Sequence, residues 1–217
     1  MKLKKWLEKI FPRYSWIPLI CVAAMNFLTY SATLLLVNDS RRHYIHMEID
    51  DRIPFIPAFV FFYVASFVQW GLNWFFTARE SERFCYRFAK ADIIAKIPCL
   101  IMFVAYPTII QKPPMEVTDF FTFAMSVVWF FDKPVNCLPS VHALASWIAL
   151  RAMFQMHKPA KIWRVLAVVF CAGCFAAVVF TKQHYLIDIP AGVLAAEIGL
   201  AVSKRLDDER FLWLRAG

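Results

Sequence analysis

Charged residues are scarce in this chain. Asp, Glu, Lys and Arg make up 18% of its 217 residues, whereas 60% are hydrophobic and 17% aromatic. A soluble domain of this length cannot bury so much apolar surface. The composition therefore argues against a soluble globular protein and predicts an integral membrane protein.

The chain also lacks internal repeats, low-complexity segments and polar linkers, so we expect residues 1–217 to form one domain of the all-α class. Six apolar runs approach the roughly 20 residues that a membrane-spanning helix needs. A shorter aromatic stretch, residues 120–131, is expected to lie along the membrane interface as a loop helix. The six predicted spans cover residues 16–37, 53–76, 91–110, 139–155, 162–181 and 185–203.

A single basic patch is missing, which argues against a nucleic-acid partner despite the net charge of +8. Most Lys and Arg residues instead lie before the first apolar run, between the second and third, around the connection of the fourth to the fifth, and after the sixth. The positive-inside rule then places both termini in the cytoplasm. We expect a multi-pass protein of the plasma (inner) membrane, and the sequence does not indicate its oligomeric state.

The sequence also lacks signs of a cleavable signal peptide and of disulfide bonds. No small-residue cleavage site follows the N-terminal lysines, so we expect the first apolar run to be retained as a helix. Of the six cysteines, only Cys137 falls clearly on the non-cytoplasmic side, so no disulfide framework is predicted.

Two polar motifs stand out against this background. Residues 136–143 read Asn-Cys-Leu-Pro-Ser-Val-His-Ala, and residues 181–188 read Thr-Lys-Gln-His-Tyr-Leu-Ile-Asp. Each motif places a histidine, His142 or His184, at the non-cytoplasmic mouth of an apolar run. An ionisable residue is costly at such a position, which indicates a functional site.

The residue types in these motifs suit the binding of a phosphate ester. Pro139 and Ser140 are typical of a helix start, where unpaired backbone N–H groups bind anions, and His142 could donate a proton to the bound group. His184 and Asp188, four residues apart, share one helical face, so the carboxylate can fix the imidazole tautomer and leave the other nitrogen as a nucleophile.

Cations for the phosphoryl oxygens are available nearby. Lys182, and Lys112 from the long connection, are candidates for this role. Asn136 either contacts the phosphate or stabilises the turn before Ser140. Asp132 and Lys133 are interpreted as a solvated loop pair.

Two further interpretations concern histidines and buried charges. Paired histidines at helix ends could also hold haem or a metal, but Asp188 on the face of His184 favours orientation of the imidazole. Arg151 and Glu197 lie inside predicted spans, and we expect them either to pair between the fourth and sixth spans or, for Arg151, to reach the cytoplasmic interface.

At these residues the chain resembles the type 2 phosphatidic acid phosphatase (PAP2) superfamily. The family pattern has three parts: Lys separated by six residues from Arg-Pro; Pro-Ser-x-His; and Ser-Arg followed by five residues, His, three residues and Asp. Residues 139–142 match the second part, and His184 with Asp188 matches the end of the third.

The resemblance extends over residues 106–192 and implies a six-helix membrane core with its site at the non-cytoplasmic face. It also implies Ser140 as a phosphate contact, His142 as general acid, His184 as nucleophile and Asp188 as its orienting carboxylate. A covalent phosphohistidine intermediate and no metal or other cofactor are implied as well.

The chain departs from the family pattern in its cations. Lys112-Pro113 stands where Arg-Pro is expected, Ala105 stands at the first Lys position, and Lys182 lies two residues before His184 instead of six. The segment Thr-Lys-Gln-His-Tyr is more similar to the branch that contains inositol phosphorylceramide synthases. Members of that branch pass a phosphoryl-bearing group to a lipid alcohol.

Three functions therefore stay open, with a lipid phosphate in the bilayer as the expected ligand. The leading expectation is a metal-independent lipid phosphate phosphatase whose site faces the periplasm, the exterior or a lumen. The alternatives are a phosphotransferase that delivers a headgroup to a lipid alcohol, and a non-enzymatic lipid-binding or transport protein with the same fold.

Overall fold

The computed structural model describes residues 8, 10–37 and 41–216, and the regular structure of this part of the chain is helical. Its only strand-like pairings are two isolated bridges, His43 with Thr108 and Ile109 with Val135. The all-α prediction is thereby confirmed. Four basic residues that contributed to the predicted charge asymmetry lie outside the described residues: Lys2, Lys4, Lys5 and Lys9.

Helices occupy all six predicted apolar runs. The first run contains η1 (Arg13–Ser15), α2 (Trp16–Phe27), the π-helical turn η2 (Leu28–Ala32) and α3 (Thr33–Leu36), and the second contains η4 (Pro57–Phe59) and α5 (Val60–Glu80). The others contain α6 (Glu82–Ala105), α8 (Val141–Gln155), α9 (Lys161–Phe180) and α10 (Asp188–Ala216). The connections hold α4 (Glu48–Arg52) and α7 (Phe120–Phe131), the latter at the bounds predicted for the short loop helix.

Three helices of the described chain are long and apolar enough to cross a membrane: Arg13–Leu36, Pro57–Glu80 and Lys161–Phe180. The count of six spans is therefore not confirmed. The other three helices fall short for physical reasons. Charged residues interrupt α6 and α10, and the 15 residues of α8 extend only about 22 Å at 1.5 Å per residue.

Helix boundaries follow from side-chain caps. Ser81 caps α6 by accepting a hydrogen bond from Phe84 N, and Asp119 caps α7 by accepting from Thr122 N at 2.8 Å. A side-chain oxygen at such a position satisfies a backbone N–H that has no partner within the helix. With this cap, Ser81 is the single residue at which the chain turns from α5 into α6.

The core is built on close contact between helices with small side chains. Gly199 of α10 lies against the Ala91 carbonyl and Ala95 of α6, so closely that a Cβ atom would collide with them. Buried Ala195 and Ala196 extend this surface. Small residues let helix backbones approach, which is the usual way that helices pack in a membrane.

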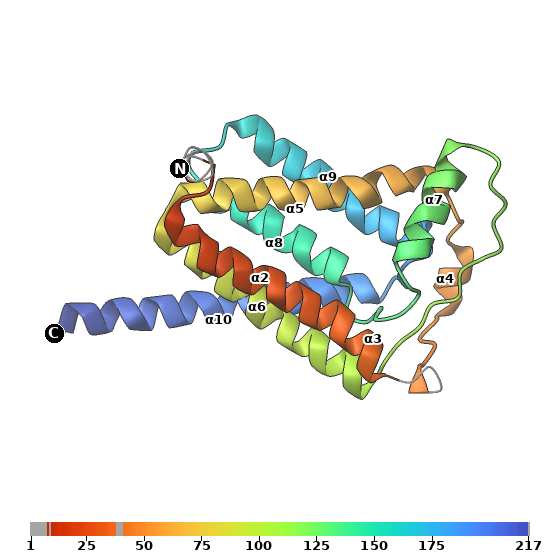
Figure 1. The fold of residues 1–217 in the computed structure, drawn as a ribbon, viewed down its shortest axis with the longest axis horizontal. Coiled ribbons are helices and arrows are strands. Elements are labelled where there is room, and N and C mark those ends of the chain that lie inside the picture. Colours follow the sequence, from red (N-terminus) through yellow and green to blue (C-terminus); the bar gives the residue numbers. More distant parts are fainter. Residues whose placement is uncertain (1–7, 9, 38–40, 217) are drawn as a thin grey trace.

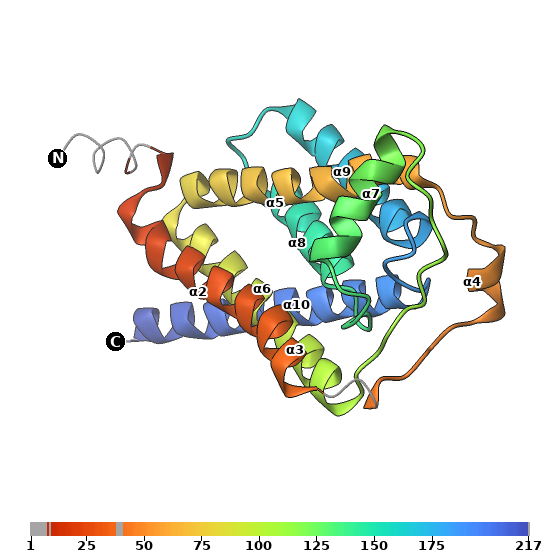
Figure 2. The ribbon, with the colours of Figure 1, turned by 45° about the vertical axis from the view of Figure 1, so that its right-hand side comes forward.

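The two ends of the bundle differ in structure. Figure 1 shows α4, α7 and the connections around them at one end, whereas the α5–α6 turn and the end of α10 lie at the other. The turned view in Figure 2 shows α7 lying across the ends of α5, α8 and α9. Both histidine motifs lie at the end with α4 and α7, which we name the histidine end.

Candidate functional site

The second motif is positioned by the way α9 ends. Lys182 adopts a left-handed backbone conformation (φ 54°), and its N–H donates to Val179 O at 3.1 Å while Gln183 N–H donates to Val178 O at 2.9 Å. This pair of hydrogen bonds is a Schellman motif, in which glycine is the usual left-handed residue. The turn ends α9 and leads directly into the buried His184.

The side chain of Lys182 holds this turn in place. Its ammonium group donates to the carbonyl oxygens of Asp50 at 3.0 Å and Ile53 at 2.6 Å. The carboxylate of Asp50 accepts a hydrogen bond from Leu186 N at 2.9 Å. The segment around α4 is thus clamped to the second motif, and Lys182 is engaged with backbone oxygens.

His184 and Asp188 form the predicted pair. Asp188 Oδ2 lies 3.0 Å from His184 Nδ1 and accepts from Tyr185 N at 3.0 Å, while Cys137 O lies 3.0 Å from the same Nδ1. Asp188 is fully buried and His184 is 7% exposed. Among the described residues no hydrogen bond uses Nε2 of His184, so that nitrogen is available for chemistry.

The first motif is anchored by a buried threonine. Thr108 Oγ1 accepts hydrogen bonds from Cys137 N and Leu138 N, both at 3.0 Å, and Thr108 O accepts from Asn136 N at 3.1 Å. Asn136 adopts φ 59°, a left-handed conformation that Asn tolerates better than most residues. Its side-chain amide donates to Thr33 at 2.7 Å.

Ser140 joins the two motifs. Its hydroxyl caps α8 by accepting from Ala143 N at 3.2 Å, and its backbone N–H donates to Asp188 O at 3.0 Å. Gly192, in the first turns of α10, packs against the Ser140 carbonyl so closely that a Cβ atom would collide with it. Ser140 is fully buried, so it acts here through the backbone and the helix cap.

His142 faces His184 from the first turn of α8. Their ring centroids are 5.7 Å apart, and the His142 ring packs against Tyr63 at 4.6 Å and Trp70 at 5.4 Å. His142 Nε2 is buried and has no hydrogen-bond partner in the described chain. Two imidazoles with available nitrogens therefore share one site.

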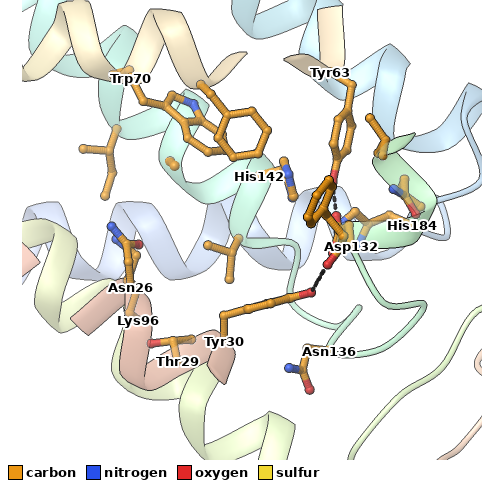
Figure 3. A pocket seen from close by; sticks show the side chains of 18 of the residues that line it. Asn26, Thr29, Tyr30, Tyr63, Trp70, Lys96, Asp132, Asn136, His142 and His184 are labelled. Atoms are coloured by element: carbon orange, nitrogen blue, oxygen red, sulfur yellow. Dashed lines mark hydrogen bonds between the residues drawn. The ribbon is translucent and has the colours of Figure 1, made fainter. Parts of the chain in front are cut away.

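Both histidines line a cavity of about 600 Å³ inside the bundle. Its wall includes exposed residues of three helices, among them Asn26 of α2, Phe67 of α5 and Phe131 of α7. The cavity is therefore open at the side of the bundle. Such an opening would admit an amphiphile from a surrounding lipid layer. Figure 3 shows His142 and His184 with the other polar groups around this space.

A carboxylate beside the histidines is held by two tyrosines. Asp132, at the C-terminal end of α7, accepts hydrogen bonds from Tyr30 at 3.1 Å and from Tyr63. Figure 3 shows Asp132 between these two hydroxyl groups. The interpretation of Asp132 as half of a solvated pair was wrong, because its carboxylate ties α7 to η2 and α5. Lys133 is exposed and lines the cavity.

The cations predicted from the sequence lie outside the cavity wall. Lys112 donates to Asp132 O at 2.9 Å, and its Nζ lies 5.3 Å from the centroid of the Trp129 ring. Burial lowers the pKa of Lys112 from its ordinary value to about 8, although Asp132 opposes this shift. Of the predicted site residues, His142, His184 and Asn136 line the cavity, while Ser140 and Asp188 stand behind them.

Three residues near the second motif could in principle hold a metal ion. Cys137, His184 and Asp188 place potential ligand atoms within 4.8 Å of one another. The hydrogen bond to Asp188 already uses His184 Nδ1, and burial raises the pKa of the Cys137 thiol, which disfavours the thiolate that binds metals. The arrangement of these residues therefore suits the orientation of the His184 imidazole better than the binding of a metal ion.

Arg151 and Glu197 form an ion pair, which was the first of the two interpretations offered for them. Arg151 Nη1 donates to Glu197 Oε1 at 2.8 Å, and Trp147 donates to the same oxygen at 2.6 Å. The contact joins α8 to α10, although both side chains remain partly exposed at the bundle surface.

Sequence reasoning missed several residues that shape the site. Asp50 and Thr108 act through contacts with distant segments, and Tyr63, Asp92 and Lys96 line or approach the cavity from within apolar helices. For the buried Lys96 a signal was present, because a lysine inside an apolar run is costly without a role.

Comparison with known proteins gave one match. A family model described as the PAP2 superfamily matches residues 53–202, a range that includes both histidine motifs and all of α5, α6, α8 and α9. The match does not select the branch related to inositol phosphorylceramide synthases. No curated protein and no solved structure matched the chain.

Proposed function

Because the chain belongs to the PAP2 superfamily, we propose that it is a membrane phosphatase that hydrolyses the phosphate ester of a lipid. Membership suggests a phosphatase or a phosphotransferase in a membrane. The observation that carries the proposal is the buried pair of His184 and Asp188, with the ring of His142 centred 5.7 Å from that of His184 in the wall of the same cavity.

The proposed reaction begins with attack of His184 Nε2 on phosphorus. The bond from phosphorus to the ester oxygen breaks, and His142 donates its proton to that oxygen, so the lipid leaves as an alcohol. Asp188 accepts from Nδ1–H of His184 and stabilises the positive charge that forms on the phosphorylated ring. A phosphohistidine remains.

Water completes the cycle. His142, now neutral, takes a proton from a water molecule, and the resulting hydroxide attacks phosphorus as the bond to His184 breaks. Inorganic phosphate leaves and both histidines return to their starting states. If a lipid alcohol takes the place of water, the same steps give a phosphate monoester of that alcohol. A phosphodiester forms only when the group held on His184 carries a headgroup ester of its own.

The phosphate charge requires donors near the histidines. Lys133 lines the cavity, and the backbone N–H groups of Val141 and His142 begin α8, where the helix dipole favours an anion. Lys112 supports this end of the cavity through its bond to Asp132 O.

We further propose that the histidine end faces the periplasm, the exterior or a lumen. Support comes from the other end of the bundle, where basic residues cluster around the α5–α6 and α8–α9 turns, as cytoplasmic connections do. They include Arg79, Arg83, Arg87, Lys90, Lys158 and Lys161.

Phosphate release from a panel of lipid phosphates tests the proposal. The panel contains phosphatidate, phosphatidylglycerophosphate, a polyprenyl diphosphate and a lipid A phosphate, each with and without an added lipid alcohol. We expect His184→Ala to abolish phosphate release, whereas His157→Ala, an exposed histidine at the opposite end, should leave it unchanged.

The outcomes separate the candidate functions. Free phosphate indicates hydrolysis, and a new phosphate ester of the added alcohol, formed only when that alcohol is present, indicates transfer. Turnover that persists in His184→Ala would overturn the assigned nucleophile. Complete inactivity of the folded wild type on the whole panel would favour the non-enzymatic alternative.

A further inference from the structure

A buried ion pair lies deep in the same cavity, away from the histidines. Lys96 and Asp92, one helical turn apart on α6, form this pair, and they are 0% and 2% exposed. Both line the cavity. A charged pair inside an apolar bundle carries a large desolvation cost, which is seldom retained without a role.

This pair does not fasten one helix to another. Arg151 and Glu197 join α8 to α10, and Lys90 pairs with Asp207 to join α6 to α10. By contrast, the described contacts give Lys96 Nζ and the Asp92 carboxylate no partner outside α6. Helix packing therefore does not explain why these two charges are buried.

An unpaired acceptor belongs to a residue of α5 that lines the same cavity and a smaller neighbouring one. Asn73 is 4% exposed and lines the cavity, and its side-chain oxygen Oδ1 has no hydrogen-bond partner in the described chain. A buried acceptor without a donor is costly, and native proteins usually satisfy it. A bound hydrogen-bond donor would remove that cost.

These three residues line the cavity beyond the level of the histidines. His142 packs against Tyr63, Phe67 and Trp70 of α5, and Asn73 lies three to ten residues further along that helix, which corresponds to about 5–15 Å at 1.5 Å per residue. Figure 3 shows Asn26, Thr29 and Lys96 on one side of the cavity and His184 and Asp132 on the other. Aromatic side chains of α5, including Phe67, Trp70 and Trp74, line the cavity as well.

We propose that Asn73, Asp92 and Lys96 form an inner polar site that binds a hydroxyl group within the body of the lipid substrate. The inference rests on the proposed function, because it assumes that the phosphate of the same lipid lies at His184. It assigns the substrate to the class of lipids that carry a hydroxyl group in the body of the lipid, about 5–15 Å from the phosphate.

The chemistry of the cluster favours a neutral hydroxyl over a second anion. Asp92 already balances the charge of Lys96, so a second phosphate would meet no net positive charge. A hydroxyl can donate to Asn73 Oδ1, and it can also accept from Lys96, which has three N–H donors. A simple alkyl chain would leave the Asn73 acceptor unsatisfied.

A binding experiment with non-hydrolysable probes tests the site. The probes are hexadecylphosphonate, analogues that carry one hydroxyl at successive positions along the chain, and the matching neutral compounds without phosphonate. Intrinsic fluorescence reports binding, because Trp70 and Trp74 line the cavity. Wild type should bind the best-placed hydroxyl analogue roughly threefold to tenfold more tightly than the plain chain, as expected for one hydrogen bond.

Asn73→Leu is the decisive variant, because it replaces the unpaired amide with an apolar side chain of similar size. It should lose the preference for the hydroxyl and bind the plain chain as wild type does. Thr77→Val is the matched control: Thr77 lies one turn further along α5, is fully buried and has an unpartnered hydroxyl, but it does not line this cavity. This variant should keep the preference.

A second variant removes both charges of the pair. Asp92→Leu combined with Lys96→Met avoids a buried unpaired charge and should also lose the preference. The site is refuted if wild type shows no preference at any hydroxyl position, or if Asn73→Leu retains it. If the wild type binds the phosphonate probes no more tightly than the matching neutral compounds, the proposed function is contradicted instead. The neutral probes measure the inner site separately, so the two failures can be told apart.

Discussion

Lys182 Nζ donates a hydrogen bond of 2.6 Å to the carbonyl oxygen of Ile53, a residue 129 positions earlier in the sequence. The same ammonium group also bonds to Asp50 O. Lys182 itself is in a left-handed conformation, which costs a non-glycine residue about 1 kcal/mol or more. These contacts offset that cost and fix the turn that presents His184.

Replacement of Lys182 should therefore affect folding more than substrate affinity. We expect Lys182→Met to lower the free energy of unfolding by roughly 1–3 kcal/mol, because hydrogen bonds to a charged group are lost. Lys133→Met, at a cation that lines the cavity, should leave stability unchanged and weaken phosphonate binding. Denaturant unfolding and phosphonate titration of both variants give the two measurements. A stable Lys182→Met that has lost phosphonate affinity would contradict this assignment.

Asp188 should control turnover through His184. Asp188→Asn keeps the size of the side chain but removes the charge that stabilises the imidazolium, so we expect turnover to fall by about 10²- to 10⁴-fold with little change in KM. Steady-state kinetics on a lipid phosphate provide the measurement. Cys137→Ser serves as the control, since Cys137 meets His184 Nδ1 through its backbone oxygen, which this substitution keeps. Unchanged turnover in Asp188→Asn would rule out the orienting role.

Gly192 should be intolerant of a larger side chain. In Gly192→Ala the new methyl group would meet the Ser140 carbonyl and force α8 and α10 apart. We expect a loss of roughly 1–3 kcal/mol in the free energy of unfolding, together with reduced turnover. Gly71→Ala is a suitable control, because nothing lies within 4 Å of the corresponding Cβ position. Thermal unfolding and phosphate release should separate the two variants.

Lys112 should make stability depend on pH in the alkaline range. Its pKa is about 8 in the folded protein and near 10.5 when unperturbed. Between these values the unfolded chain binds more protons, so the contribution of Lys112 to the free energy of unfolding rises with pH. We expect Lys112→Met to lack this rise. The Tm of both proteins measured from pH 7 to about 10.5 tests the point, and parallel profiles would contradict it.

The Arg151–Glu197 contact should contribute coupling energy between α8 and α10. A double-mutant cycle with Arg151→Ala and Glu197→Ala should give about 0.5–1.5 kcal/mol, a modest value because both side chains are partly exposed. Additive effects of the two substitutions would show that the contact contributes nothing to stability.

Local patterns account for what could be predicted. The helices could be located because apolar runs and caps act within a few residues, as in α7 at residues 120–131. The pairing of His184 with Asp188 was predicted correctly, but the expected helical face was not its cause, because His184 lies in the turn before α10 and Asp188 is the first residue of that helix. The predicted count of six spans is not confirmed, since charged residues in α6 and α10 weaken the hydropathy signal.

The partners of the polar side chains could not be predicted in this way. Lys112 and Lys182 stand close to the motifs in sequence, yet both donate to backbone carbonyl oxygens. Asp132 meets Tyr30 and Tyr63, which lie 102 and 69 positions away. No short pattern encodes such contacts, because they depend on where helices cross.

The sequence by itself determined a helical membrane chain with two histidine motifs, since hydropathy and helical periodicity are properties of neighbouring residues. Only the tertiary structure decided that His142 and His184 share a cavity with Asn73, Asp92 and Lys96. These residues come from α5, α6, α8 and the turn after α9, and close packing of small residues between helices brings them together. The inner polar cluster therefore exists only in the folded bundle.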